Sequence, residues 1–200
     1  ISTDGGATFN ILANGGVYSG ATTASLAITG VTAGLNNNQY RCVVTGVCPV
    51  SPLTSNAATL TVPSALNITT QPANATICAG SNTSFTVAGT GINAYQWQIS
   101  TDGGTTWNNV SNGGVYSGAT SATLTITGAT AALNNNRYRC NVSSAACGTL
   151  SSTGAILTVN TAPAITTQPT SASVCTGANH TFTVATTGTS LTYQWFMSTD

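Results

Sequence analysis

The chain contains short runs in which apolar residues alternate with small polar ones. Four clear examples lie at residues 83–87, 95–99, 122–126 and 155–159. A period of two places successive side chains on opposite faces, which is typical of half-buried antiparallel strands. Clusters of Gly, Asn and Asp separate the runs and indicate turns. Only the stretch 129–133 suggests a helical turn, so the pattern predicts an all-β fold of short strands.

The same pattern returns at a spacing of 98 residues. The recurring segments are 1–6 and 99–104, 15–20 and 113–118, and 40–42 and 138–140. A third copy begins where the Tyr-Gln-Trp of 95–97 reappears at 193–195. A period of this length is a whole domain rather than one turn of a solenoid. With roughly seven to nine strands in each copy, the repeat predicts tandem two-sheet β-sandwiches.

Proline-containing stretches mark the predicted domain boundaries. Pro63 and the segment 160–163 follow the last strand of a copy, where proline does not interrupt a strand ladder. We therefore place boundaries near 62/63 and 159/160. The predicted domains are the C-terminal part of one copy (1–62), a complete copy (63–159) and the N-terminal part of another (160–200).

The complete copy resembles an immunoglobulin domain. Residues 124–128 and 133–140 look like strands E and F, and Trp97 stands where the strand C tryptophan is expected. Tyr138, two residues before Cys140, matches the tyrosine corner. The same positions in the other copies are occupied by Tyr40, Cys42 and Trp195. The resemblance implies an extended array of immunoglobulin-like sandwiches, although Val87 replaces the first cysteine of the usual inter-sheet disulfide.

A second resemblance concerns the wider protein. Cys-Ala-Gly at 78–80, Ser-Thr-Asp-Gly-Gly, Tyr-Arg-Cys and Cys147-Gly148 together are similar to immunoglobulin-like repeats in giant secreted or cell-surface proteins of Bacteroidota-type bacteria. That resemblance implies an extracellular location and a mechanical role as a repeat of a surface filament or adhesin stalk. Its expected partners are neighbouring copies, joined head to tail with further lateral contacts. The alternative is a carbohydrate-binding array that grips a glycan through turns carrying Tyr18 and Tyr116.

Charge is almost absent from the chain. Charged residues make up 3% of the composition, against about 25% in an ordinary soluble domain, and the formal net charge is zero. Hydrophobic residues still make up 41%, enough for packed cores. A neutral surface offers nothing that would attract nucleic acid or an anionic membrane, and no apolar run reaches the ~18 residues of a membrane span. We therefore expect neither partner, whereas neutrality favours contact between copies.

One motif invites a catalytic interpretation. Residues 100–107 fit the Asp-box pattern Ser-x-Asp-x-Gly-x-Thr-Trp of sialidases, and residues 2–9 repeat it with a final Phe. A sialidase would also need an arginine cluster and an acidic partner for its nucleophile. The motif equally suits a hairpin in which Asp102 accepts hydrogen bonds from turn amides and Trp107 packs beneath. We interpret Asp4 and Asp102 as structural residues.

Other catalytic chemistry lacks the necessary groups. General acid and base catalysis needs titratable side chains that converge on one pocket. His180 occurs in only one copy and matches no metal-ligand spacing, so we interpret it as an exposed structural residue. Asp102 and Arg139 offer one opposite-charge pair, which at a surface would contribute only about 0–1 kcal/mol. The sequence predicts no enzyme, no cofactor and no metal site.

The cysteines carry a structural hypothesis. The complete copy has Cys78, Cys140 and Cys147, and the partial copies contribute Cys42, Cys48 and Cys175. Regular cysteines in an extracellular chain favour oxidation. The immunoglobulin topology puts Cys78 and Cys147 at opposite ends of the sandwich, roughly 30 Å apart, whereas a disulfide needs a Cα separation under about 7 Å. Two alternatives stay open: Cys78 bonds to the last cysteine of the following copy, or Cys140 bonds to Cys147 across their hairpin.

Overall fold

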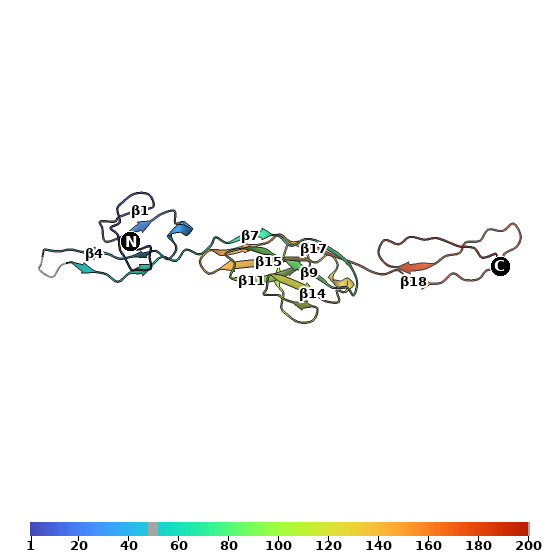
Figure 1. The fold of residues 1–200 in the computed structure, drawn as a ribbon. Helices are drawn as coiled ribbons and strands as arrows, with labels where there is room; N and C mark the ends of the chain where they lie inside the picture. Colours follow the sequence, from blue (N-terminus) through green and yellow to red (C-terminus); the bar gives the residue numbers. More distant parts are fainter. Residues whose placement is uncertain (48–51, 200) are drawn as a thin grey trace. The chain divides into compact units, whose positions relative to one another are not determined.

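The computed structural model describes residues 1–47 and 52–199 (Figure 1). These residues form short β-strands joined by turns, together with two single-turn 3-10 helices, η1 (Ala33–Leu35) and η2 (Ala131–Leu133). Helix η2 occupies the stretch in which the sequence suggested a helical turn. The described chain is therefore almost entirely strand and turn.

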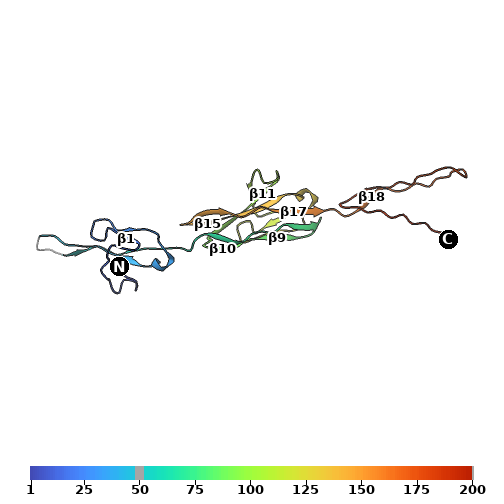
Figure 2. The same ribbon diagram turned by 90° about the horizontal axis from the view of Figure 1, so that it is seen from above.

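The chain divides into two compact units, Ile1–Ala65 and Leu66–Asp200, and the second contains a complete sandwich. The larger sheet has the order β12 (Asn108–Asn109), β11 (Ala94–Ser100), β15 (Arg137–Ser144), β17 (Ala155–Asn160) and β8 (Ala75–Cys78), with β16 (Gly148–Ser151) also paired to β15. The smaller sheet has the order β13 (Tyr116–Ser117), β14 (Thr123–Ile126) and β9 (Thr83–Thr86), and β7 (Asn67–Thr70) pairs with β10 (Ala88–Thr90). Figure 2 shows the two layers, with β11, β15 and β17 on one side and β9 and β10 on the other.

The core lies between these layers because every second residue of each strand points inward. In β15 the buried positions alternate strictly with half-exposed ones, and β17 follows the same rule. Trp97 and Phe85 fill the centre, and the Phe85 ring stacks on Tyr138 with 5.0 Å between ring centroids. The Trp97 Nε1–H donates to the Ser121 carbonyl at 2.9 Å, so its one polar atom is satisfied. The remaining buried apolar residues are Val87, Val110, Ala119, Leu124, Ile126, Ala129, Cys140, Val142, Ala155, Leu157 and Val159.

Strands β8 and β17 pair in parallel, unlike the other strand pairs of the described chain. Their register runs from Ala75 beside Leu157 to Cys78 beside Asn160. The second strand of the domain, β8, which follows β7, and its last strand, β17, are thus adjacent and point the same way. The chain enters β8 at one end of this pair and leaves β17 at the other.

Repeated asparagines tie the turn after η2 to β17. Asn135 adopts a left-handed φ of 65°, which asparagine tolerates better than most residues, and its N–H donates to the Leu157 carbonyl at 2.8 Å. The Asn134 Oδ1 accepts from the Val159 N–H at 2.9 Å. The corresponding turn of the first unit has the same two bonds, made by Asn37 to Leu60 and by Asn36 to Val62. The Asn-Asn-Asn run therefore fixes the position of the last strand segment against this turn in both units.

The first unit holds the second half of a sandwich. Its strands form three antiparallel pairs: β1 (Tyr18–Ser19) with β2 (Ala27–Ile28), β3 (Gln39–Tyr40) with β6 (Ala58–Thr59), and β4 (Val43–Val44) with β5 (Leu53–Thr54). These pairs correspond to β13 with β14, β15 with β17, and β15 with β16 of the complete domain.

The end of the chain holds the first half of a sandwich. Strands β18 (Ala164–Thr167) and β19 (Ala185–Thr187) pair antiparallel, as β7 and β10 do. The described residues after β19, which include Trp195, form no further strand. Together with the complete domain, these elements confirm the predicted all-β, tandem immunoglobulin-like sandwich fold.

Candidate functional site

The Asp-box motif forms a closed turn at the end of β11. The Asp102 carboxylate accepts hydrogen bonds from the Ser100 hydroxyl at 2.7 Å, the Thr105 N–H at 3.0 Å, and the Thr106 N–H and hydroxyl at 2.9 and 2.6 Å. Ser100 is fully buried, and its oxygen accepts from the Gly104 N–H at 2.8 Å. The hydrogen bonds from the Thr106 hydroxyl and N–H are the main reason why the pKa of Asp102 lies well below its usual range. The carboxylate is thus occupied by its own turn.

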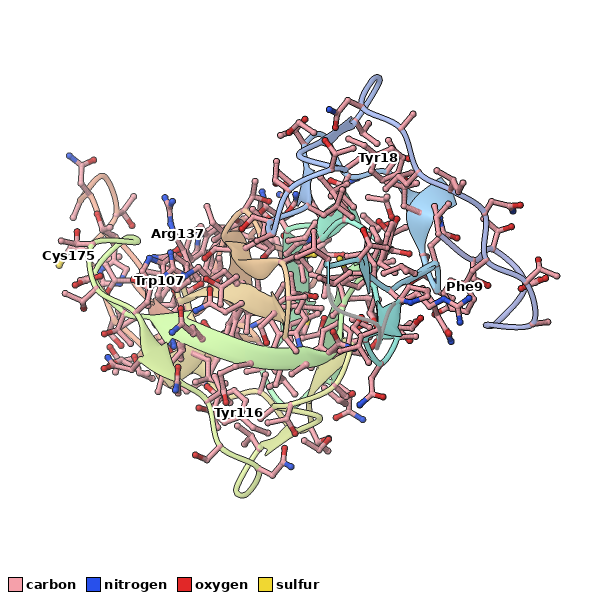
Figure 3. The ribbon with its side chains drawn as sticks, turned by 90° about the vertical axis from the view of Figure 1, so that its left-hand side faces the viewer. Phe9, Tyr18, Trp107, Tyr116, Arg137 and Cys175 are labelled. Carbon is pink, nitrogen blue, oxygen red and sulfur yellow. The ribbon has the colours of Figure 1, made fainter. Side chains whose placement is uncertain are left out.

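The aromatic residue of the motif packs against an arginine. The half-buried Trp107 donates its Nε1–H to the Gly104 carbonyl at 3.0 Å (Figure 3). The Arg139 guanidinium lies over the Trp107 ring, with Cζ 4.3 Å from a ring centroid, and its Nε–H donates to Gln98 at 2.9 Å. Arg139 therefore makes a cation–π contact and a neutral hydrogen bond, in place of the salt bridge to Asp102 that the sequence suggested.

The first unit repeats this arrangement with a different aromatic residue. Asp4 accepts from Ser2 at 2.7 Å and from the Thr8 N–H at 2.9 Å, and its pKa is likewise held below the usual range by Thr8. The Arg41 guanidinium lies over Phe9, with Cζ 3.8 Å from the ring centroid. The turn and its arginine–aromatic contact recur as a unit, which indicates an architectural role for the motif.

The tyrosines of the Gly-Gly-Val-Tyr turns fold back onto the sandwich. The Tyr116 hydroxyl lies 3.1 Å from the Tyr138 hydroxyl, and their ring centroids are 6.2 Å apart. Tyr18 and Tyr40 repeat the contact at 3.2 Å. The pKa of Tyr138 is raised above its usual range, mainly by burial. The pKa of Tyr18 is raised to about 12, mainly by its hydrogen bond to Tyr40. Tyr18 and Tyr116 are half-buried, and each hydroxyl is hydrogen-bonded to a second tyrosine.

Cys140 is a buried free thiol. It lies opposite Trp97 in the β11–β15 register, and burial raises the pKa of Cys140 to about 11. Its N–H donates to the Ser152 hydroxyl at 2.8 Å, so Ser152 is its neighbour across the hairpin. Cys147 lies in the hairpin turn beyond Ser144, about 13 Å further along the strand, whereas a disulfide needs a Cα separation under about 7 Å. The predicted alternative of a Cys140–Cys147 bridge is wrong.

The other described cysteines lie on the surface. Cys78 ends β8 beside Asn160, and it is exposed and free. Cys42 and Cys175 are also exposed free thiols. Cys48 lies outside the described residues. The register of β8, β17, β15 and β16 puts Cys78 and the turn containing Cys147 at opposite ends of the domain.

The sequence also singled out His180 and Trp195. His180 is exposed and contacts Phe182 edge-on, with 4.6 Å between ring centroids. Trp195 is exposed, unlike its buried counterpart Trp97. Among residues 1–47 and 52–199, no group of three or more His, Cys, Asp or Glu is placed to hold a metal ion. None of the described helices has the length and apolar character needed to cross a membrane.

A family model and a set of solved structures match parts of this chain. Residues 67–161 match a domain of unknown function, DUF8696. No curated protein matches the chain. An I-band fragment of titin is 23% identical, with a TM-score of 0.41 over 55% of this chain and 37% of that one. The tandem Ig repeats of Dlar are 25% identical, with a TM-score of 0.40 over 68% of this chain and 69% of that one. The strand order and core described above define an immunoglobulin-like repeat protein.

Proposed function

We propose that the chain is a structural repeat of an extracellular bacterial surface filament or adhesin stalk, and that its role is mechanical. The proposal rests mainly on how the repeated polar and aromatic groups are used. Asp102 is occupied by turn amides, Arg139 by Trp107, and Tyr116 by Tyr138. Each of these side chains therefore stabilises the fold, and the first unit repeats the same contacts.

The strand order suits a load-bearing domain. Force applied to the two ends of the complete domain acts first on β7 and its pairing with β10, and through β7 it pulls β8 in the direction opposite to β17. Because these strands are parallel neighbours with four paired positions, the force acts along the ladder and loads its hydrogen bonds together. A hairpin pulled from its open end would instead lose its bonds one at a time. The connection of β8 and β17 to the rest of the chain thus favours resistance to stretching.

Single-molecule stretching of the 200-residue chain tests the mechanical role. We expect the complete domain to rupture in one discrete step, followed by a gain in length of about 3.5 Å for each residue released. Continuous extension at low force, with no discrete step, would contradict a load-bearing role.

The surface location requires a separate experiment. An antibody raised against the chain should label intact cells that produce the parent protein, and protease added outside those cells should remove the label. Labelling that appears only after the cells are permeabilised would contradict an extracellular role. A glycan array titrated with the chain provides a third test, because a structural repeat should show no saturable binding to any sugar.

A further inference from the structure

One edge of the larger sheet in the complete domain has no neighbouring strand. Strand β16 pairs with β15 on one side, and no strand of the described chain pairs with its other side. All four residues of β16 are exposed, and Leu150 is 40% exposed. Natural proteins usually blunt such edges with charged residues, proline or a bulge. Strand β16 has the sequence Gly-Thr-Leu-Ser and an uninterrupted register with β15, so it lacks all three devices.

The strand ladder shows which backbone groups of β16 point outward. The Ser152 N–H donates to the Cys140 carbonyl at 2.8 Å. Bonded and non-bonded pairs alternate along an antiparallel ladder, so Leu150 also bonds to β15. By the same alternation, Thr149 and Ser151 turn their N–H and C=O groups away from β15. Among the described residues, neither of these two N–H groups has an acceptor.

The same outer edge is covered further along the chain. The Thr153 N–H donates to the Gln71 side chain at 2.8 Å, and the Ile156 N–H donates to the Asn74 side chain at 2.8 Å. Beyond this point β8 pairs with β17. The uncovered part of the edge is therefore confined to β16.

We propose that β16 is a docking edge to which a second copy of the chain adds its own β16 in antiparallel orientation, so that the larger sheets of two complete domains join. The segment is complementary to itself. With the two Leu150 residues opposite each other, Thr149 of each chain exchanges both backbone hydrogen bonds with Ser151 of the other. Main-chain bonds of this kind supply the affinity of strand addition at an open edge.

The side chains of β16 also suit a second copy. The two exposed Leu150 side chains cover each other in this register. No residue of β16 is charged and the formal net charge of the chain is zero, so no repulsion opposes the contact. The contact has two-fold symmetry and therefore closes at a dimer. This inference concerns a contact between chains and is independent of the mechanical role proposed above.

The first unit indicates a substitution that closes the edge without breaking the hairpin. The Ser55 N–H donates to the Cys42 carbonyl, as Ser152 does in the complete domain. Pro52 therefore stands at the position of Thr149. Strands β4 and β5 pair despite this proline. Because proline has no N–H, it is tolerated at outward positions of edge strands and removes the donor there.

Hydrogen exchange of single amides, followed by NMR at rising concentrations of the 200-residue chain, tests the pairing. We expect the Thr149 and Ser151 amides to exchange more slowly as the concentration increases. The Leu150 N–H already bonds to β15, so its exchange should change far less. Exchange of Thr149 and Ser151 that stays the same at every soluble concentration would overturn the proposal.

Two substitutions at one position provide a matched pair. Thr149→Pro removes one outward N–H from each chain, so the concentration that half-protects Ser151 should rise at least about tenfold. Thr149→Ala keeps the N–H and should leave this concentration nearly unchanged. Thermal unfolding of the complete domain checks that both variants fold. Equal protection of Ser151 in the two variants would contradict pairing through β16.

Introduced cysteines test the two-fold register. Residues at position 150 form a non-bonded pair with Cα atoms about 4.5 Å apart, which a disulfide tolerates. Under air oxidation, Leu150→Cys should give a dimer linked through the introduced cysteines, whereas Thr149→Cys should not. Peptide mapping distinguishes this link from bonds to the exposed Cys42, Cys78 and Cys175. Introduced cysteines that bond only to these native thiols, in both variants alike, would overturn the proposed register.

Discussion

At the scale of single residues, the chain uses its rare polar and aromatic groups to hold turns and to fill one core. Asp102 receives hydrogen bonds from side chains and amides of its own turn. Trp97 is enclosed between the sheets and hydrogen-bonded to Ser121. Cys140 is packed beside it as a free thiol. Each of these roles leads to a measurable consequence.

Replacement of the central tryptophan should unfold the complete domain. Trp97→Ala removes a fully buried side chain, which typically costs about 3–5 kcal/mol of a total stability of roughly 5–15 kcal/mol. Urea unfolding followed by circular dichroism measures the loss. Trp195→Ala is the matched control, because the same side chain is exposed there. Equal stability of Trp97→Ala and the unaltered chain would contradict the assigned core.

The Asp102 turn should make the stability of the complete domain depend on pH. Hydrogen bonds from Thr106 lower the pKa of Asp102 in the folded state. The ionised carboxylate therefore adds its full contribution to the free energy of unfolding at pH values above the unfolded pKa of about 3.9. That contribution is lost as the pH falls below this value toward the folded pKa. We expect the unaltered domain to be less stable at about pH 2 than at about pH 5. Asp102→Asn should lower stability at the higher pH and flatten the pH dependence in urea titrations; an unchanged slope would exclude this mechanism.

The buried thiol should react only after unfolding. Burial raises the pKa of Cys140 to about 11, so little thiolate forms at neutral pH, and the side chain is inaccessible to reagents. In the native chain, a thiol reagent should label the exposed Cys78 quickly and Cys140 at the rate of domain opening. Peptide mapping over time distinguishes the two sites. Labelling of Cys140 as fast as Cys78 would show that the core is open.

At the scale of elements, side chains from the loops fasten the last strand into the larger sheet. The Asn134 Oδ1 accepts from the Val159 N–H, and the Asn74 Oδ1 accepts from the Ile156 N–H at 2.8 Å. Backbone bonds to β8 complete the attachment. Strand β17 is therefore held by its two neighbouring strands and by loops from both ends of the domain sequence.

Loss of one of these amide contacts should cost a measurable part of the stability. Asn134→Ala leaves the Val159 N–H without its partner, and a typical hydrogen bond contributes about 0.5–1.5 kcal/mol. Asn108→Ala, at an exposed position on β12, is the control and should change stability by less than about 0.5 kcal/mol. Chemical unfolding of both variants provides the comparison. Similar values for the two variants would show that the amide contact adds nothing.

At the scale of the whole molecule, the chain is a series of copies of one domain plan. The complete domain has its own core, and the described chain separates into units at Ala65 and Leu66. A domain that has its own hydrophobic core can fold independently of its neighbours in the chain.

The complete domain should fold without the first unit. A chain that starts at Leu66 and ends at Thr199 retains every residue of the buried cluster. We expect its unfolding midpoint to match that of the corresponding transition in the full chain. The comparison is made at a concentration low enough to prevent association. A large loss of stability would show that the core depends on residues 1–65.

The fold class, the repeat and the turn chemistry follow from the order of residues along the chain. Alternation with a period of two identifies strands because side chains of a strand point to opposite faces. The hydrogen bonds of Asp102 can also be predicted from the sequence, since the partners lie within four residues of it. Local contacts of this kind depend only on the order of residues along the chain.

Which distant groups come into contact depends on how the strands pair in three dimensions. Alternation reveals the buried face of a strand but not its register, and a change of one residue in register exchanges all the neighbours. The structure therefore supplied the Tyr116–Tyr138 contact across 22 residues and the position of Arg139 over Trp107. It also placed Cys140 opposite Trp97, far from the hairpin turn, which excluded one of the two predicted disulfides. These contacts join separate strands, so they follow from how the strands pair rather than from any local pattern.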